Sequence, residues 1–507
     1  MDKVFDWLFQ KKKRFFLLLI LAAFCLRAAS LIYPFLDSDE SIFAVIARQL
    51  SDGGRLYADG LDNKPPFIFL FYRLCFALFG PSMWGVHLAT IALSIFEAIL
   101  LFKIASENSD ERTGYFAALF YTVFSTTFLP KFIATSINAI MVVPLTLACL
   151  YWLRGEKRMN LKDDFRAGLF TGIAFLFKFQ GGIQLALFLF SLLPFLKERK
   201  EETSVSAIRF GACLGGFLVP AALTLLWLAL SGILSDFVDW TLLGSFTYIR
   251  AGVETISFWP NLLFRGGGFV LSSLLLWVLA FLSVREERNP FKIFLLLWFA
   301  LSLIPVSMGG RFYGHYFIQL LPPLCLLAGM KASQIRHSPA LKWVGMGLAV
   351  PALIFWIIRS DFKRIDELFP DDHLFIQQNI GEWLKGNADP GKTLFVWGNA
   401  PAIYYFSDLK PASRFIFSEY LTGKIQGSDK SGQAYPKAWD LLWADFSKPP
   451  DYLVDTSPAG IHGYAKFPVG NYPEMFRYIQ AHYVFWKNIY GCPVYKIRKA
   501  RTITPPN

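Results

Sequence analysis

The stretch KKKRFFLLLILAAFCLRAASLIYPFLDSDE, residues 11–40, decides the fold class. Four basic residues precede an apolar run from Phe15 to Tyr33, and the acidic cluster Asp37-Ser38-Asp39-Glu40 follows it. Because basic residues stay in the cytoplasm, the pattern predicts a membrane-spanning helix with the acidic cluster on the outer face. Small residues at 28–30 are also typical of a cleaved signal peptide, but the apolar run continues past them and favours a retained span.

The composition predicts a polytopic α-helical membrane protein. Apolar residues make up 54% of the chain, and hydrophobic runs recur with short polar breaks to about residue 358. A soluble core does not need such runs, and a transmembrane barrel would alternate apolar with polar residues. The net charge of +12 suits nucleic acid or anionic lipid, but its distribution favours membrane topology and excludes nucleic acid as the expected partner.

About eleven spans are predicted, and the charges of the loops support their register. Lys and Arg are frequent in the loops assigned to the cytoplasm. Outside, apart from the first loop and the C-terminal region, they are sparse and comprise Lys131, Lys178, Arg250, Arg265 and Arg311. The N-terminus is therefore expected in the cytoplasm. The spans are 15–33, 83–103, 114–129, 139–153, 167–177, 183–196, 208–231, 261–283, 291–307, 316–333 and 340–358.

The first external loop, residues 34–82, is predicted to hold two interfacial helices. Phe67–Phe79 is apolar but short, and counting it as a span would invert every later loop. We therefore expect it to lie in the outer interface after Pro65-Pro66. Residues 41–50 form one apolar face and are expected to lie beside it.

The chain is predicted to consist of a transmembrane catalytic domain, residues 1–358, and an extracytoplasmic soluble α/β domain, residues 359–507. After Ile358 the sequence becomes polar, with strand-like runs at 393–397 and 452–454. Helical patterns at 372–385 and 473–481 accompany these runs. No internal repeat of the kind seen in many transporters is present.

Asp39 is the first candidate for chemistry. Group transfer to a hydroxyl or amine needs a carboxylate within hydrogen-bond reach of the proton of the acceptor. The same residues also suit a helix start, because Asp37, Ser38 or Asp39 can cap a helix over 41–50. The two roles are compatible, since a cap also fixes the position of a carboxylate.

Two further motifs carry cations to the same predicted face. Lys64, in Asp62-Asn63-Lys64-Pro65-Pro66, suits a phosphate contact, although a single interfacial lysine also reaches the lipid headgroups. Residues 309–316, GGRFYGHY, bring Arg311, His315 and Tyr316 together, either as a pocket for a phosphate and a sugar or as an aromatic interface belt. Basic groups at the outer surface would hold the phosphate of a lipid-linked substrate while Asp39 deprotonates the acceptor.

These motifs make the chain resemble the polyprenyl-phosphate-dependent GT-C glycosyltransferases, specifically the bacterial relatives of protein O-mannosyltransferases and the lipid A aminoarabinose transferase. The resemblance covers residues 15–333. It rests on Asp39-Glu40 after the first span, Lys64-Pro65-Pro66 in the first loop, and His315-Tyr316 leading into Leu321-Pro322-Pro323.

The resemblance implies inverting transfer of one sugar from a polyprenyl-phosphate donor to a lipid, glycan or protein acceptor. Asp39 would be the general base with Glu40 beside it, while Lys64 and Tyr316 match donor-contacting positions. Arg311, His315, Arg250 and Lys178 are further candidates for the donor phosphate by their placement. The resemblance also implies a bacterial cytoplasmic (inner) membrane location with the 359–507 domain outside.

One position departs from the family pattern. Several relatives carry an essential aspartate in the second external loop, where this chain has Asn138. Asn138 and Asp37 are therefore candidates for acceptor-binding or second-loop residues. The absence of an aspartate at position 138 puts a second catalytic carboxylate in doubt. The sequence assigns no cofactor or metal ligands and leaves a divalent metal open. Two alternatives remain, an oligosaccharide polymerase or ligase with a lipid-diphosphate donor, and a lipid or sugar transporter that uses Glu97.

Overall fold

The computed structural model describes residues 2–128, 131–193, 203–287, 289–335, 339–360, 372–426, 432 and 434–498. The chain divides into two compact units. The helical unit comprises Met1–Asp37, Lys64–Leu234 and Ser245–Ile365, and the sheet unit comprises Ser38–Asn63, Ser235–Gly244 and Asp366–Asn507. The chain therefore passes between the units at Asp37-Ser38 and again at Asn63-Lys64.

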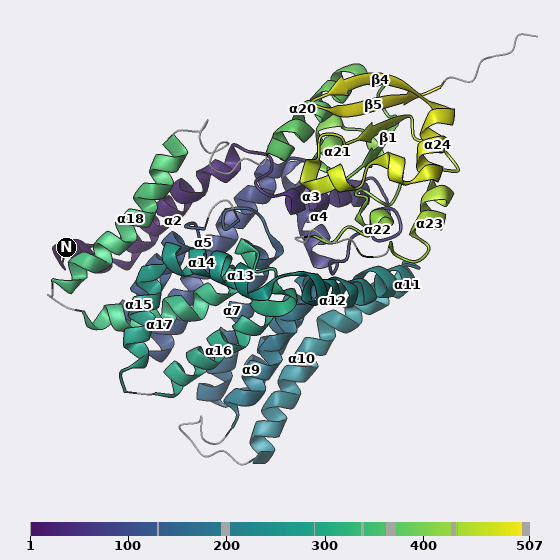
Figure 1. Ribbon diagram of the computed structural model, residues 1–507. Coiled ribbons are helices and arrows are strands. Elements are labelled where there is room, and N and C mark those ends of the chain that lie inside the picture. Colours follow the sequence, from purple (N-terminus) through teal and green to yellow (C-terminus); the bar gives the residue numbers. More distant parts are fainter. Residues whose placement is uncertain are drawn as a thin grey trace, which may run out of the picture. The chain divides into compact units, whose positions relative to one another are not determined.

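The helical unit is built mainly from long apolar helices (Figure 1). Each of the eleven predicted spans contains a helix, although residue 129 of the third and residues 194–196 of the sixth lie outside the described residues. The helices are α1 (Asp2–Phe9), α2 (Lys12–Arg27), α4 (Phe67–Phe79), α5 (Met83–Asn108), α6 (Glu111–Phe124), α7 (Ile137–Arg158), α8 (Leu161–Phe177), α9 (Ile183–Ser191), α10 (Thr203–Leu230), α12 (Gly244–Thr255), α13 (Phe258–Asn261), α14 (Gly267–Ser272), α15 (Leu274–Val284), α16 (Pro290–Ser307), α17 (Leu321–Gln334) and α18 (Ala340–Ser360).

Five helical segments of the described chain are each long and apolar enough to cross a membrane: Lys12–Leu31, Met83–Asn108, Ile137–Arg158, Thr203–Leu230 and Pro290–Gly310. The span predicted at 261–283 differs from a straight helix. Phe258–Ser272 and Leu274–Val284 meet at an angle of 84°. The bend falls at Ser273, whose φ of −124° and ψ of 26° lie outside the helical region.

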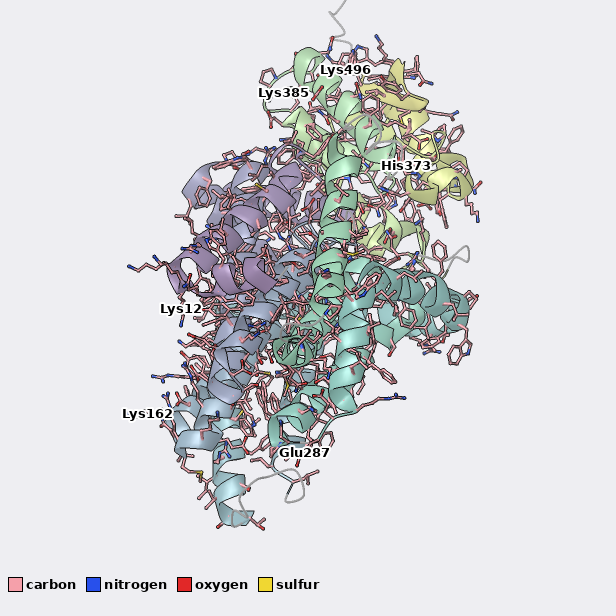
Figure 2. The ribbon with its side chains drawn as sticks, turned by 90° about the vertical axis from the view of Figure 1, so that its left-hand side faces the viewer. Lys12, Lys162, Glu287, His373, Lys385 and Lys496 are labelled. Atoms are coloured by element: carbon pink, nitrogen blue, oxygen red, sulfur yellow. The ribbon has the colours of Figure 1, made fainter. Side chains whose placement is uncertain are left out.

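Lys162 and Glu287, from two loops assigned to the cytoplasm, both lie near one end of the helical unit (Figure 2). At the junction of α8 with α10, the helices approach through glycine. A side chain at Gly168 would place its Cβ 1.7 Å from the carbonyl oxygen of Cys213. Asp164 and Arg209 form a buried two-bond ion pair between the same helices, with both bonds 3.1 Å long. Small residues and a buried ion pair therefore fix this contact.

The sheet unit contains a five-stranded sheet of order β2-β1-β3-β5-β4. The runs predicted as strands form β1 (Thr393–Trp397) and β3 (Tyr452–Asp455), which are parallel neighbours. The remaining strands are β2 (Lys410–Pro411), parallel to β1, and the antiparallel pair β4 (Tyr483–Ile489) and β5 (Cys492–Ile497). The helices of this unit are α3 (Ser38–Ser51), α11 (Leu234–Asp236, shared with the helical unit), α20 (Asp372–Asn387), α21 (Ala402–Ser407), α22 (Glu419–Thr422), α23 (Ala438–Asp445) and α24 (Pro473–His482).

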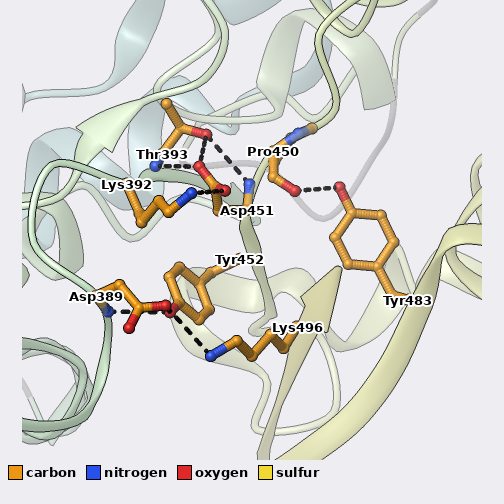
Figure 3. A network of polar contacts seen from close by, with 8 residues as sticks. All are labelled: Asp389, Lys392, Thr393, Pro450, Asp451, Tyr452, Tyr483 and Lys496. Carbon is orange, nitrogen blue, oxygen red and sulfur yellow. Dashed lines mark hydrogen bonds and ion pairs between the residues drawn. The ribbon is translucent and has the colours of Figure 1, made fainter. Parts of the chain in front are cut away.

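The amino ends of the two central strands are joined by side chains (Figure 3). The carboxylate of Asp451 accepts hydrogen bonds from the backbone N and Oγ1 of Thr393, both 2.9 Å long, and pairs with Lys392. Tyr483 donates a 2.7 Å hydrogen bond to the carbonyl oxygen of Pro450. The Asp451 contacts hold the start of β1 against the start of β3, and the Tyr483 contact ties β4 to the segment before β3.

The first external loop differs from the predicted pair of interfacial helices. Both helices form, but α3 belongs to the sheet unit and α4 to the helical unit. Six successive residues of α3, 42–47, are buried, so the helix is covered on nearly all sides rather than on one face. It packs on α21, where Arg48 pairs with Asp408 at 3.0 Å and covers the ring of Tyr405 at 3.9 Å. Contacts 360 positions away in the sequence cause this difference.

Candidate active site

The segment after α16 turns sharply at two glycines. Gly309 and Gly310 have φ angles of +74° and +66°, a region that strains residues with a side chain. The turn carries Arg311 into the interior, where only 1% of the residue is exposed. The carbonyl oxygen of Arg311 accepts a 2.7 Å hydrogen bond from Arg265, whose guanidinium lies 5.0 Å from the ring centre of Tyr313.

Three cations of the helical unit meet two tyrosine rings. The guanidinium carbon of Arg311 lies 3.8 Å from the ring centre of Tyr248, and Nζ of Lys64 lies 5.8 Å from the same centre. Nζ of Lys178 lies 4.0 Å from the ring centre of Tyr316, and the two tyrosines share a hydrogen bond. We call these five residues the cation–tyrosine cluster. Positive charge gathered in a shielded place favours an anion, and the planar guanidinium suits a phosphate or carboxylate.

Asp37 and His315 extend this cluster. Asp37 is buried and forms an ion pair with Lys131 of the second external loop. The pKa of His315 is lowered to about 3, mainly by burial; Asp37 opposes the shift, and the positive charges of Lys131, Lys178 and Lys64 contribute to it. His315 is therefore a neutral imidazole at pH 7, and it contributes hydrogen bonding rather than charge to any anion held here.

The segment that precedes α7 is held in place from two helices. Arg27, at the end of α2, is buried and donates hydrogen bonds to the carbonyl oxygens of Phe132 and Ser125, at 3.1 and 2.9 Å. Tyr72 of α4 donates a 2.9 Å hydrogen bond to the carbonyl oxygen of Thr135. Beyond this segment, Asn138 begins α7 with its Oδ1 3.3 Å from Nζ of Lys178, so the predicted second-loop residue adjoins the cation–tyrosine cluster.

The structure thus brings Lys64, Lys178, Arg311, His315 and Tyr316 together. It does not bring Arg250 to them. The side chain of Arg250 is 81% exposed and pairs with Glu254 one helical turn away, at 2.7 Å. Tyr248, two residues earlier in the chain, belongs to the cluster instead. The sequence did not distinguish Tyr248, because aromatic residues make up 17% of the chain.

Asp39 and Glu40 lie in the first turn of α3, in the sheet unit. Acidic residues at this end of a helix are favoured by the helix dipole. Glu40 is completely buried, whereas Asp39 is partly exposed. Of the two, Asp39 is therefore the carboxylate that a substrate can approach. Among the residues that the structure describes, no three His, Cys, Asp or Glu side chains gather closely enough to hold a metal ion.

Gly252→Ala is expected to destabilise the helical unit by about 1–3 kcal/mol, the usual effect of overpacking. A Cβ at this position of α12 would lie 2.3 Å from Nη1 of Arg311 and 2.5 Å from the carbonyl oxygen of Gly309. Thermal unfolding of the purified protein measures the effect. Gly267→Ala is the matched control, because a Cβ there meets nothing within 4 Å. Equal Tm values for the two variants would contradict the packing.

Acid is expected to destabilise the protein through His315. Its folded-state pKa of about 3 lies below the ordinary 6.5, so protons bind the unfolded chain preferentially as the pH falls below 6.5. This group then costs ~1.4 kcal/mol for each pH unit down to about 3. Tm measured at pH 7.5 and 5.5 should fall less in His315→Asn than in the wild type. Parallel curves for the two proteins would exclude a buried neutral histidine.

Residues 63–227 match the family described as dolichyl-phosphate-mannose-protein mannosyltransferase. The matched range contains Lys64, Asn138 and Lys178, whereas Asp39, Arg311 and Tyr316 lie outside it. A search of curated protein sequences found no match.

Solved structures share the fold over nearly the whole chain. ArnT from Cupriavidus metallidurans bound to undecaprenyl phosphate is similar with a TM-score of 0.61 at 12% identity, over 98% of this chain and 100% of that one. Its apo state gives a TM-score of 0.60 at 13% identity, over 94% and 97%. AglB, an archaeal oligosaccharyltransferase from Archaeoglobus fulgidus, gives 0.55 at 14% identity, over 96% and 74%. Residues 63–227 are thus similar to a mannosyltransferase family, and the chain as a whole shares the fold of ArnT and AglB.

Proposed function

We propose that this chain is an inverting glycosyltransferase that moves a single sugar from a polyprenyl-phosphate donor to a lipid, glycan or protein acceptor. The observation that carries the proposal is the cation–tyrosine cluster, in which Lys64, Lys178 and Arg311 gather around two tyrosine rings. A phosphate diester bound there would leave as a phosphate monoester with an additional negative charge. Fixed cations stabilise that developing charge, so the leaving group needs no proton.

Asp39 is proposed as the general base. It takes the proton of the acceptor hydroxyl or amine while that atom attacks the anomeric carbon. The bond between this carbon and the phosphate oxygen breaks, and its electron pair goes to the phosphate. Attack from the side opposite the phosphate inverts the anomeric configuration. One covalent bond forms, one breaks, and the proton moves to the carboxylate.

The path of the chain supports this assignment. Asp39 follows Asp37 by two residues, and consecutive Cα atoms are 3.8 Å apart, so these two Cα atoms lie within about 8 Å of each other. Asp37 itself lies beside Lys131 and His315. Lys64 is the first residue after the chain returns to the helical unit. Covalent geometry thus keeps the Cα atom of Asp39 close to that of Asp37.

The relatives support a lipid-linked donor and the site at a membrane. The similar ArnT structure holds undecaprenyl phosphate, and the similar AglB structure holds dolichol-phosphate together with an inhibitory peptide. Both lipids are polyprenyl phosphates, the class proposed here. We further propose a bacterial cytoplasmic membrane location, with the N-terminus inside and residues 359–507 outside, in agreement with the distribution of basic residues.

A lipid-diphosphate oligosaccharide donor is the second candidate, and the similarity to the oligosaccharyltransferase AglB favours it. Asn138 stands against it, because a diphosphate donor calls for more carboxylates and a metal. A transporter is less well supported. Its candidate residue, Glu97, is buried in α5 and accepts a 2.5 Å hydrogen bond from Thr146 of α7, an ordinary contact between packed helices.

The proposal is tested by incubating the purified protein with polyprenyl monophosphates carrying mannose, glucose, galactose or aminoarabinose. Lipid, glycan and protein acceptor fractions are then analysed by mass spectrometry, with and without a chelator. We expect addition of one sugar, release of polyprenyl phosphate and an inverted anomer by NMR. Transfer from a polyprenyl diphosphate oligosaccharide alone would replace this proposal with the second candidate.

A further inference from the structure

The sheet unit carries a group of polar residues at the carboxyl ends of its two central strands. The loop after β1 contains Asn399 and leads toward β2, whereas the loop after β3 contains His462 and leads toward β4 on the other side of the sheet. Connections that leave neighbouring parallel strands in opposite directions create the place where α/β sheets bind ligands. The amino ends of the same strands are occupied by the Asp451 contacts described above.

Glu419, the first residue of α22, stands at the centre of this group. Nδ2 of Asn399 donates a 2.9 Å hydrogen bond to its Oε1, and Nε2 of Gln426 donates to the same oxygen. Nδ1 of His462 lies 2.7 Å from the carbonyl oxygen of Asn399. Lys424 lies near enough to stabilise the charge of Glu419 and also faces the ring of Tyr464 at 5.6 Å.

Two hydrogen-bond acceptor atoms of this group can still accept a hydrogen bond from a ligand. Within the described parts of the chain, Oε2 of Glu419 receives no hydrogen bond, and the residue is partly exposed. Asn399 is 3% exposed, and its Oδ1 has no partner among the residues that the structure describes. Leaving a buried acceptor unsatisfied is costly, so Oδ1 of Asn399 favours a ligand that donates a hydrogen bond, and Oε2 of Glu419 can accept from the same ligand.

The supporting backbone is rigid. The backbone N of Gly398 donates to Oγ of Ser418 at 3.0 Å, and the backbone N of Ser418 donates to the oxygen of Gly398 at 2.8 Å. Thr456, after β3, donates twice to the carbonyl oxygen of Trp397. A Cβ at Gly398 would lie 1.9 Å from Oγ1 of Thr456. The three segments that carry the polar group are therefore joined directly to each other.

We propose that Glu419, Asn399, Gln426, Lys424 and His462 bind an uncharged hexose unit of the acceptor through its neighbouring hydroxyl groups. A hydroxyl both donates and accepts, so adjacent hydroxyls donate to Glu419 and Asn399 and accept from Lys424. A phosphate or carboxylate would meet the carboxylate of Glu419 and is disfavoured. The proposal rests on the function proposed above, because it makes the sheet unit the part that recognises a glycan acceptor.

Saturation-transfer NMR on the full-length protein, in a detergent without a sugar headgroup, tests this site. The probes are methyl mannoside, methyl glucoside and methyl galactoside. We expect transfer to ring protons of at least one hexoside, reduced at least tenfold in Glu419→Ala and in Asn399→Ala. Asp440→Ala, which removes an exposed carboxylate of the same unit, is the matched control and should bind as the wild type does.

Two further variants make the result decisive. Glu419→Gln keeps the size of the side chain and is used with a Tm measurement if Glu419→Ala does not fold; it should also weaken binding. Asp39→Asn should bind hexosides normally even when transfer is lost, which separates this site from the proposed base. Equal saturation transfer in the wild type and Glu419→Gln, or none from any hexoside in the wild type, would overturn the proposal.

Discussion

Asp39→Asn is expected to reduce sugar transfer by ~10²–10⁴-fold, the usual contribution of a general base. The amide has the size of the carboxylate but does not accept the proton of the acceptor. The expected loss falls on kcat, while the KM for the donor changes little, because the donor phosphate is proposed to lie with the cations of the helical unit. Initial rates with a saturating polyprenyl-phosphate sugar measure it.

The substitution should leave the fold intact. The buried surface of α3 comes from residues 42–47, and Asp39 is partly exposed in its first turn. Losing an acid at a helix start costs at most ~1 kcal/mol. Asp52→Asn provides the control, since it makes the same chemical change just after the other end of α3, where Asp52 pairs with Lys410 in an exposed contact. Transfer in Asp39→Asn within threefold of that control would exclude Asp39 as the base.

The helices of the membrane region could be predicted because their signal is local. Each apolar run was long enough to specify a helix, and the sparse external cations indicated the register. The same scarcity singled out Lys178 and Arg311, which now lie on tyrosine rings. Because cations are rare on the predicted outer face, a cation there is a better indicator of a functional site than an aromatic residue, and aromatic residues are common throughout this chain.

The features that could not be predicted depend on distant contacts. The burial of α3 requires Arg48 to reach Asp408, which no local pattern encodes. Tyr248 enters the cation–tyrosine cluster because α12 packs through Gly252 on the turn at Gly309. Arg250, two residues from Tyr248, had the better sequence argument, yet it pairs with Glu254 at the surface. Tyr248 and Arg250 are two residues apart in α12, so their side chains point to different sides of the helix, and this orientation rather than the residue type decides which of them joins the cluster.

Arg311→Ala and Lys64→Ala are each expected to lower kcat/KM for the donor by ~10²–10³-fold, comparable to removing one donor from a site of developing negative charge. Arg311→Lys should restore only part of the loss, because an ammonium lacks the planar fork and the stacking on Tyr248. Arg250→Ala serves as the control and should change kcat/KM by less than about twofold, as expected for an exposed ion pair. Tm of each variant separates lost contacts from lost folding.

The double variant Lys64→Ala with Arg311→Ala gives the sharper test, because both residues face the ring of Tyr248. If they hold one phosphate, removing the second cation after the first should cost much less than removing it alone, since groups that act as a unit are not additive. Fully additive losses would mean that the two cations act on separate charges. Equal losses in Arg250→Ala and Arg311→Ala would mean that general positive charge, not this cluster, draws the donor to the protein.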